Sequence, residues 1–213
     1  MKCHVLTKHC KTVVAIAFTL LLFAVVISTV LYEASIIFPY DRVANKNIPS
    51  EFFCVGDENR IDFQTDGNCA SYASAYVLRS FGEQTDGENI APEIKRVFGF
   101  VAPKSIVRLF QKHGFSAKVY RGDTDTLKHR LSGGVPIIVF VSIPNDTHYA
   151  VVVGYDERYF YLVDSLEENK NANDTRYNRK LAVEEFQKIW KTDTLLPDNI
   201  YIVPSILDGK TTR

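Results

Sequence analysis

The stretch that decides the fold is QTDGNCASYASAYVLRSFG, which runs from Gln64 to Gly82. A turn-forming cluster opens it, and small and apolar residues then recur at helical spacing. Asn68 is a residue type that caps helices, because its side-chain oxygen can accept from a free backbone N–H of the first turn. Glycine is favoured just beyond a helix end, where a left-handed conformation is common. The pattern therefore predicts a helix with Cys69 in its first turn and Gly82 at its C-terminal end.

The position of Cys69 has a chemical consequence. The first turn of a helix carries partial positive charge, which favours a thiolate over a thiol. A cysteine placed there is a candidate nucleophile if a base can reach it. Free cysteines are also common as small buried side chains, so the position alone leaves both interpretations open.

A second informative stretch is HYAVVVGYDERYFYLVDS, which runs from His148 to Ser165. Two apolar runs flank a short polar connection, a pattern typical of a β-hairpin. If the hairpin is centred on Asp156, His148 lies directly across from Asp164, with Cβ atoms about 5 Å apart. Such an aspartate fixes the imidazole tautomer and leaves the other ring nitrogen to take a proton from a thiol. The alternative is a solvated histidine at a strand end and a solvated turn aspartate, and a register shift of one residue would favour it.

The rest of the chain predicts an α+β domain, helical in its first half and rich in strands in its second half. Helices are expected at 91–98, 105–113, 123–131 and 181–190, and strands at 115–120, 135–141, 148–155, 159–163 and 200–203. The strand at 135–141 is almost wholly apolar, which predicts a central place in the sheet.

An apolar run near the N-terminus, Val13 to Leu31, is nineteen residues long without a charge, proline or glycine. At about 1.5 Å per residue its helix would measure roughly 28 Å, close to the hydrocarbon thickness of a bilayer. A cleaved signal peptide would have a shorter apolar region and a small residue where this chain has Tyr32. The run therefore indicates a signal anchor, with secretion after signal cleavage as the alternative. Because three lysines precede it, the positive-inside tendency sends the following residues across the membrane.

These features divide the chain into a cytoplasmic N-terminal segment (1–12), a transmembrane signal anchor (13–32), a linker (33–57), a folded domain (58–206) and a tail (207–213). From Glu33 onward there are 22 basic and 25 acidic residues, without the clustered basic face that nucleic-acid binding requires. The four cysteines form neither a disulfide framework nor a paired metal-ligand spacing, so we expect no metal and no cofactor. Cys54 lies in the apolar patch EFFCVGD and is expected to pack against the core, without a disulfide to Cys69.

Taken together, these residues resemble the papain-like cysteine peptidases, and in particular the bacteriocin-processing (double-glycine leader) peptidases and their peptidase-like relatives. The phrases LSGGVPIIVFV, HYAVVVGYD, FYLVDS and VEEFQKIW follow that group in order and spacing, over about residues 58–203. The resemblance implies a nucleophile helix packed on an antiparallel sheet and a peptide or protein substrate. It also implies Cys69 as nucleophile, His148 as general base and Asp164 as orienting acid. Gln64 would be the oxyanion-hole donor beside the backbone N–H of Cys69.

Two features depart from the family pattern. Four residues separate Gln64 from Cys69 where the family usually has five, and Ala70 replaces the glycine that usually follows the cysteine. The leader peptidases are commonly the cytoplasmic front end of an export transporter. This chain has neither a transporter segment nor a phosphate-binding loop, so the processing of double-glycine leaders is not carried over to it.

Three classes of function fit this reading. The favoured one is a membrane-anchored cysteine peptidase that cleaves peptide bonds through a Cys-His-Asp triad. Acyl transfer or deamidation would use the same triad, because each proceeds through a thioester whatever nucleophile follows. A catalytically silent domain of the same fold could bind a peptide in the cleft. The complete set of Gln64, Cys69, His148 and Asp164 favours an enzyme, since a binding module does not need all four.

Overall fold

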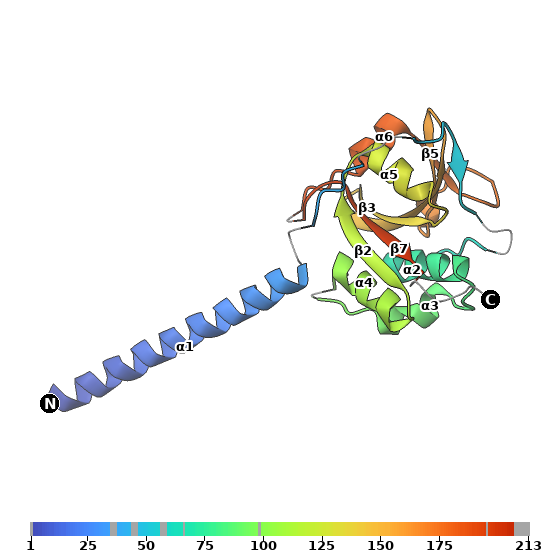
Figure 1. Cartoon of the computed structure of the whole chain (residues 1–213). Helices are drawn as coiled ribbons and strands as arrows, with labels where there is room; N and C mark the ends of the chain where they lie inside the picture. Colours follow the sequence, from blue (N-terminus) through green and yellow to red (C-terminus); the bar gives the residue numbers. More distant parts are fainter. Residues whose placement is uncertain are drawn as a thin grey trace. The chain divides into compact units, whose positions relative to one another are not determined.

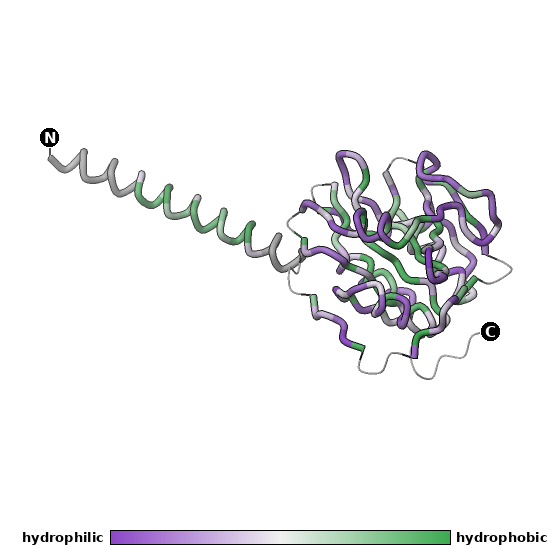
Figure 2. Tube along the Cα trace, turned by 90° about the horizontal axis from the view of Figure 1, so that it is seen from above, coloured by the Kyte–Doolittle hydropathy of each residue, from purple (hydrophilic) through white to green (hydrophobic). Residues whose placement is uncertain are grey.

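The structure is a computed structural model that describes residues 2–34, 38–43, 47–55, 59–65, 67–97, 99–194 and 196–206, with the side chains of 2–11 and 29–34 left out. The chain divides into two compact units, Met1–Ser35 and Ile36–Arg213. The first unit contains the single helix α1 (Lys2–Ala34). Its described side chains, from residue 12 to residue 28, are exposed and mostly apolar (Figure 2). In the described part of the chain, no helix is both long and apolar enough to cross a membrane.

The second unit is built on an antiparallel sheet (Figure 1). Its strands are β1 (Phe52–Phe53), β2 (Ser116–Arg121), β3 (Ile137–Ile143), β4 (Asp146–Tyr155), β5 (Tyr159–Val163), β6 (Arg179–Ala182) and β7 (Ile200–Ser205). They lie in the order β2-β7-β3-β4-β5-β6, and β1 pairs with β4. The apolar strand expected at 135–141 is therefore an interior strand, β3, with β7 and β4 on its two sides.

Helices cover both faces of this sheet (Figure 1). They are α2 (Cys69–Ser80), α3 (Gly87–Ile90), α4 (Pro103–Lys112), α5 (Thr124–Leu131) and α6 (Val183–Ile189), with short 3-10 turns at Ala91–Glu93 and Glu167–Asn169. Helices α2 and α4 pack on one face, and α5 and α6 on the other. Alternate residues of β3 explain this, because Ile137, Val139 and Val141 join the core beneath α5 and α6 while their neighbours face the other way.

Helix α2 is the buried helix that the opening stretch predicts. Every residue from Ala70 to Leu78 is buried. Gly82 has a left-handed φ of 90°, and its N–H donates to the carbonyl of Arg79 at 2.9 Å. The predicted C-terminal end is thus correct, and Cys69 is the first residue of the helix.

Two local predictions are wrong. The sequence between 181 and 190 is not one helix, because β6 occupies its start and pairs with β5 before α6 begins at Val183. The helix expected at 91–98 is absent from the described residues of that range, where a 3-10 turn covers only Ala91–Glu93 and Val97 forms an isolated bridge with Phe100. In both places, contacts with parts of the fold that are distant in sequence decide the conformation of a short segment and override its intrinsic helix propensity.

The segment assigned to a linker also contributes to the domain. Phe52 and Phe53 pair with Tyr155 and Gly154 of β4. Further upstream, Asp41 donates its backbone N–H to the carbonyl of Arg121 at 2.7 Å. The described residues of this segment therefore lie on the sheet, where they extend its hydrogen bonding.

Candidate active site

Helix α2 begins at Cys69, which is half-exposed and has a free thiol. The backbone N–H groups of a first helical turn have no partner within the helix, so they point toward the end of the helix where Cys69 lies. Asn68 occupies the capping position, but its side chain does not bond the helix; its Oδ1 accepts from the guanidinium of Arg96 instead. The predicted side-chain cap is therefore wrong, although the helix begins where it was expected.

His148 and Asp164 are in direct contact. The Nε2 of His148 lies 2.7 Å from Oδ1 of Asp164, and the two residues are 1% and 0% exposed. Nδ1 is the ring nitrogen that remains, and Cys69 is close enough to the imidazole to raise its pKa. The structure thus brings together the three side chains that the sequence singled out, from α2, β4 and the end of β5.

The hairpin register behind this contact differs from the expected one. Val151 pairs with Val163 and Val152 with Leu162, and an irregularity follows before Gly154. Extending this register places Asp164 opposite Ala150, two residues from His148. Because the difference is two residues, both side chains stay on one face, and the diagonal distance is still within reach. The prediction that they lie directly across from each other is wrong, but the contact itself is present.

The surroundings of this pair favour its charged form. Burial by itself lowers the pKa of His148, but its hydrogen bonds with Asp164 and Cys69, and the charges of these two groups, raise the pKa from 6.5 to about 9. Burial by itself raises the pKa of Asp164, but the hydrogen bond and charge of His148, the N–H of Leu166 and the charge of Arg179 lower it below 3.8. Both directions agree with an imidazolium beside a carboxylate.

Asp164 is held by polar groups that sequence reasoning missed. Its Oδ2 accepts from Arg179 at 2.7 Å and from the side-chain amide of Asn169 at 3.0 Å. Its backbone N–H donates to Asn178, whose amide donates back to the carbonyl of Asp164 at 2.7 Å. Asn178 and Arg179 reach this place because β6 pairs with β5. Recognising a strand at 179–182 would have indicated both residues.

Gln64 is fixed by Ser165, the residue after Asp164. The backbone N–H of Gln64 donates to the carbonyl of Ser165 at 2.8 Å, and the hydroxyl of Ser165 donates to Oε1 of Gln64 at 2.8 Å. No bond to the side-chain amide nitrogen of Gln64 is found in the part of the chain that the structure describes. An amide nitrogen that is free to donate is what an oxyanion-hole residue needs.

A cavity of about 320 Å³ opens beside Cys69. It is lined by Cys69, Gly99, Phe100, Val101, Phe140, Asp146, Thr147 and Tyr149. The hydroxyl of Tyr149 donates to the carbonyl of Val101 at 2.8 Å, which ties the loop before α4 to β4. The walls are mainly aromatic and apolar, with one carboxylate, and a cavity of this kind suits a peptide side chain better than a charged small molecule.

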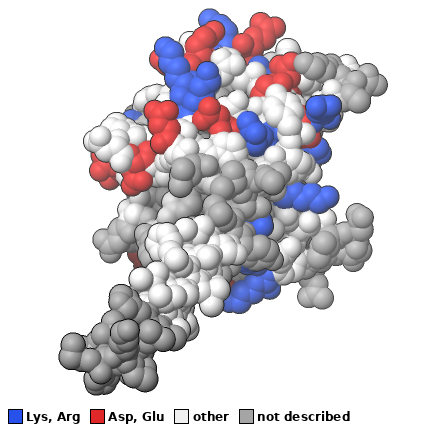
Figure 3. All heavy atoms as spheres, turned by 90° about the vertical axis from the view of Figure 1, so that its left-hand side faces the viewer, with Lys and Arg blue, Asp and Glu red and all other residues white. Residues whose placement is uncertain are grey.

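The described residues include no group of three or more histidine, cysteine, aspartate or glutamate side chains that could hold a metal ion. Figure 3 shows basic and acidic side chains interspersed on the described part of one face, with no gathering of one sign. The side chains that the structure brings together at this site are a thiol, an imidazole and a carboxylate. An antiparallel sheet that carries the histidine, with the thiol at the start of a helix packed on it, defines the class of papain-like cysteine peptidases.

Comparison with known proteins agrees with this class. Residues 58–194 match the Peptidase_C39 like family, and the chain belongs to that family of cysteine-type peptidases. The predicted recognition and the predicted cysteine-type peptidase class are thereby confirmed. A search of curated proteins finds no match.

Solved structures share the fold. A double-glycine motif protease from an AMS/PCAT transporter, solved with a leader peptide, is 18% identical, with 70% of this chain and 96% of that chain covered and a TM-score of 0.52. The peptidase domain of Streptococcus ComA, a bifunctional ABC transporter involved in quorum sensing, is 19% identical, with 70% and 99% covered and a TM-score of 0.55. Xylellain, a cysteine protease from Xylella fastidiosa, is 13% identical, with 78% and 90% covered and a TM-score of 0.55. At these identities the likeness concerns the fold alone.

Proposed function

We propose that the protein is a membrane-anchored cysteine peptidase that cleaves peptide bonds with Cys69, His148 and Asp164, and with Gln64 as oxyanion donor. The observation that carries the proposal is the buried His148–Asp164 pair, with Cys69 close enough to raise the pKa of His148. With the pKa of His148 raised to about 9, the imidazole is protonated at neutral pH. A protonated imidazole beside Cys69 is a ready acid for the amine that leaves.

The reaction follows from this arrangement. The Cys69 thiolate attacks the carbonyl carbon of the scissile bond, and the carbonyl electron pair moves onto oxygen. The backbone N–H of Cys69 and the side-chain amide of Gln64 donate to that oxyanion. His148 gives its proton to the departing amine, which leaves a thioester on Cys69. A water molecule then loses a proton to His148 and attacks the thioester, so that an acid product and the free thiolate result.

The anchor is the N-terminal run from Val13 to Leu31, which has no charge, proline or glycine. In the described part of α1 many apolar side chains are exposed, and Leu20, Leu21 and Phe23 are each more than 60% exposed. An apolar helix surface of this size is costly in water and favourable in lipid. We infer that the helix holds the catalytic domain at the outer side of the membrane.

The peptidase proposal is tested with a library of internally quenched peptides, with the products identified by mass spectrometry. Cys69→Ala should abolish cleavage without loss of folding, and His148→Ala should do nearly the same, because the members of a triad act as a unit. Cys54→Ala is the matched control and should keep activity. Cleavage by Cys69→Ala at the wild-type rate would refute the proposal. Transfer of the acyl group to an added amine in place of water would identify an acyltransferase instead.

A further inference from the structure

We propose that Ser165 is a positioning residue for the oxyanion donor, so that the dipeptide Asp164-Ser165 orients both the general base and Gln64. The inference rests on the proposed function. Asp164 holds the imidazole of His148 at 2.7 Å, and the next residue holds Gln64 by one backbone and one side-chain hydrogen bond. One short segment after β5 therefore sets the positions of two groups that act on the same peptide group, His148 at its nitrogen and Gln64 at its carbonyl oxygen.

The hydroxyl of Ser165 determines which way the amide of Gln64 faces. Ser165 is 6% exposed, so its hydroxyl is shielded from water and donates to Oε1 of Gln64. A carboxamide is two-fold, and half a turn would exchange its oxygen and nitrogen. With Oε1 occupied, the amide N–H groups are the ones available to the reaction. A turned amide would present an oxygen to the oxyanion, which repels it.

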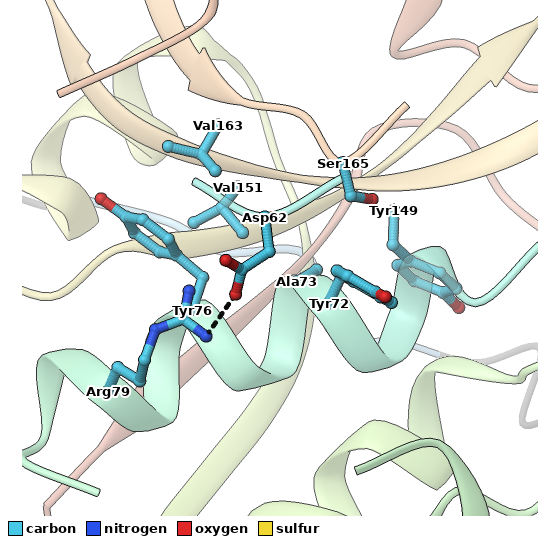
Figure 4. A pocket seen from close by; sticks show the side chains of 9 residues that line it. All are labelled: Asp62, Tyr72, Ala73, Tyr76, Arg79, Tyr149, Val151, Val163 and Ser165. Atoms are coloured by element: carbon cyan, nitrogen blue, oxygen red, sulfur yellow. Dashed lines mark ion pairs between the residues drawn. The ribbon is translucent and has the colours of Figure 1, made fainter. Parts of the chain in front are cut away.

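The segment that carries Gln64 is also fixed at its other end (Figure 4). Arg79 of α2 has a side chain that is 7% exposed and forms an ion pair with Asp62 at 3.0 Å. Its guanidinium further donates to the side chain of Asn59 at 2.9 Å and to the carbonyl of Arg60 at 2.7 Å. The path from residue 59 to residue 64 thus runs between two anchors, Arg79 and Ser165.

These anchors explain how Gln64 can be held in a fixed orientation although few residues separate it from Cys69. Four residues between Gln64 and Cys69 leave little freedom to adjust the amide by backbone movement. Its orientation must then come from a fixed partner, and Ser165 is that partner. Because an oxyanion donor acts through preorganisation, loss of the hydroxyl should reduce transition-state binding while the nucleophile stays intact.

Two reagents separate these effects. A tripeptide aldehyde, taken from a panel of N-acetylated aldehydes, is attacked at its carbonyl carbon by Cys69, and the oxygen takes the electron pair and then a proton from His148. The hemithioacetal oxygen occupies the oxyanion position. Iodoacetamide is attacked at its methylene carbon and loses iodide, so its reaction develops no oxyanion. Ser165→Ala should weaken aldehyde binding by about ten-fold, within the roughly hundred-fold loss expected for Gln64→Ala, and should leave the alkylation rate of Cys69 unchanged.

The controls make the result specific. Ser165→Thr keeps the hydroxyl and should bind the aldehyde as the wild type does. Ser132→Ala removes a half-buried hydroxyl that bonds the carbonyl of His129 at 2.7 Å, at the C-terminal end of α5, and should have no effect. In a Gln64→Ala background, Ser165→Ala should not weaken aldehyde binding further, because both changes remove the same interaction.

Three outcomes would overturn the inference. In the first, Ser165→Ala binds the aldehyde as tightly as the wild type does. In the second, Ser165→Ala weakens aldehyde binding in the Gln64→Ala background as much as it does alone. In the third, Ser165→Ala lowers the alkylation rate of Cys69 and aldehyde binding equally, which would indicate a general disruption of the site. A wild-type protein whose Cys69 is alkylated but binds no aldehyde in the panel would instead refute the proposed peptidase chemistry. If only the inference about Ser165 is wrong, the wild-type protein still binds the aldehyde, so the two failures are distinguishable.

Discussion

At His148, the effects of Asp164 and Cys69 on the pKa outweigh the effect of burial. A histidine that is 1% exposed would ordinarily be neutral, since burial disfavours the charged ring. The carboxylate of Asp164 and the sulfur of Cys69 reverse this preference and raise the pKa of His148 to about 9. The protonated form is therefore stable well above neutral pH, which is what a group that must donate a proton to a leaving amine requires.

This pKa predicts the alkaline limit of activity. The value of kcat/KM should fall as the pH rises through about 9, because His148 then loses the proton that it gives to the leaving group. Asp164→Asn removes the neighbouring charge and should move this limit to lower pH by about one unit or more. Asp193→Asn, at an exposed residue, is the control and should leave the profile unchanged. An alkaline limit that is the same in Asp164→Asn would show that the carboxylate does not set it.

The same groups predict the pH range of stability. The pKa of His148 is raised on folding, so its contribution is complete below pH 6.5 and is lost as the pH rises through about 9. The pKa of Asp164 is lowered, so its contribution is complete above pH 3.8 and is lost as the pH falls below that value. The free energy of unfolding that this pair contributes is thus greatest between these limits.

The two cysteines of the domain should differ in reactivity. Cys69 is half-exposed at a helix start, whereas Cys54 packs against the core, its thiol donates to the carbonyl of Val153 at 3.3 Å, and burial raises its pKa to about 12. Iodoacetamide should therefore modify Cys69 at least about ten-fold faster than Cys54. Peptide mapping of the non-reduced, alkylated protein measures both rates. A peptide that joins the two cysteines would contradict the free thiols seen here and would indicate a redox-gated site.

At the scale of elements, the segment before the domain is fastened by a buried cluster. Asp41 is 5% exposed and accepts from Arg130 of α5 at 2.7 and 2.8 Å. The hydroxyl of Tyr201 in β7 donates to the same carboxylate at 2.7 Å. One side chain from this segment therefore joins a helix to the sheet, which explains why residues 38–43 lie on the domain.

Asp41→Ala should lower the free energy of unfolding of the full-length protein by about 2 kcal/mol. The expected loss is at the lower end of the range for buried pairs, because the Arg130 side chain is 36% exposed and can be solvated in the variant. Tyr201→Phe removes one of the hydrogen bonds and should cost about 1 kcal/mol. Urea unfolding followed by circular dichroism measures both. The control is Tyr40→Ala, an exposed residue of the same segment, which should cost less than either.

At the scale of the whole molecule, the N-terminal run predicts a fixed topology. Protease added to intact cells should release the catalytic domain, because the positive-inside tendency keeps the three N-terminal lysines in the cytoplasm. Replacing Leu20 and Leu21 by lysine should prevent membrane retention, since two charges in the apolar run are costly in lipid. The control replaces Lys2 by arginine, which keeps the charge. A reporter fused after Arg213 that is active only in the cytoplasm would overturn this topology.

The sequence by itself determined the local elements and the chemistry they carry. Helical spacing placed Cys69 at the start of α2, and β-alternation around Asp156 brought His148 and Asp164 to one face, because both signals depend on neighbouring residues along the chain. The almost wholly apolar run at 135–141 also indicated that β3 is central. The predicted contact between His148 and Asp164 is correct although the predicted register is wrong by two residues, because a shift of two keeps each side chain on the same face of the sheet.

Only the tertiary structure decided which distant residues support the site. Arg179 and Asn178 reach Asp164 because β6 pairs with β5, and Ser165 reaches Gln64 from a position 101 residues away. Asn68 bonds Arg96 in preference to its own helix for the same reason. Such contacts join segments that share no local pattern and that meet only when the chain has folded. The order of residues along the chain does not encode them directly.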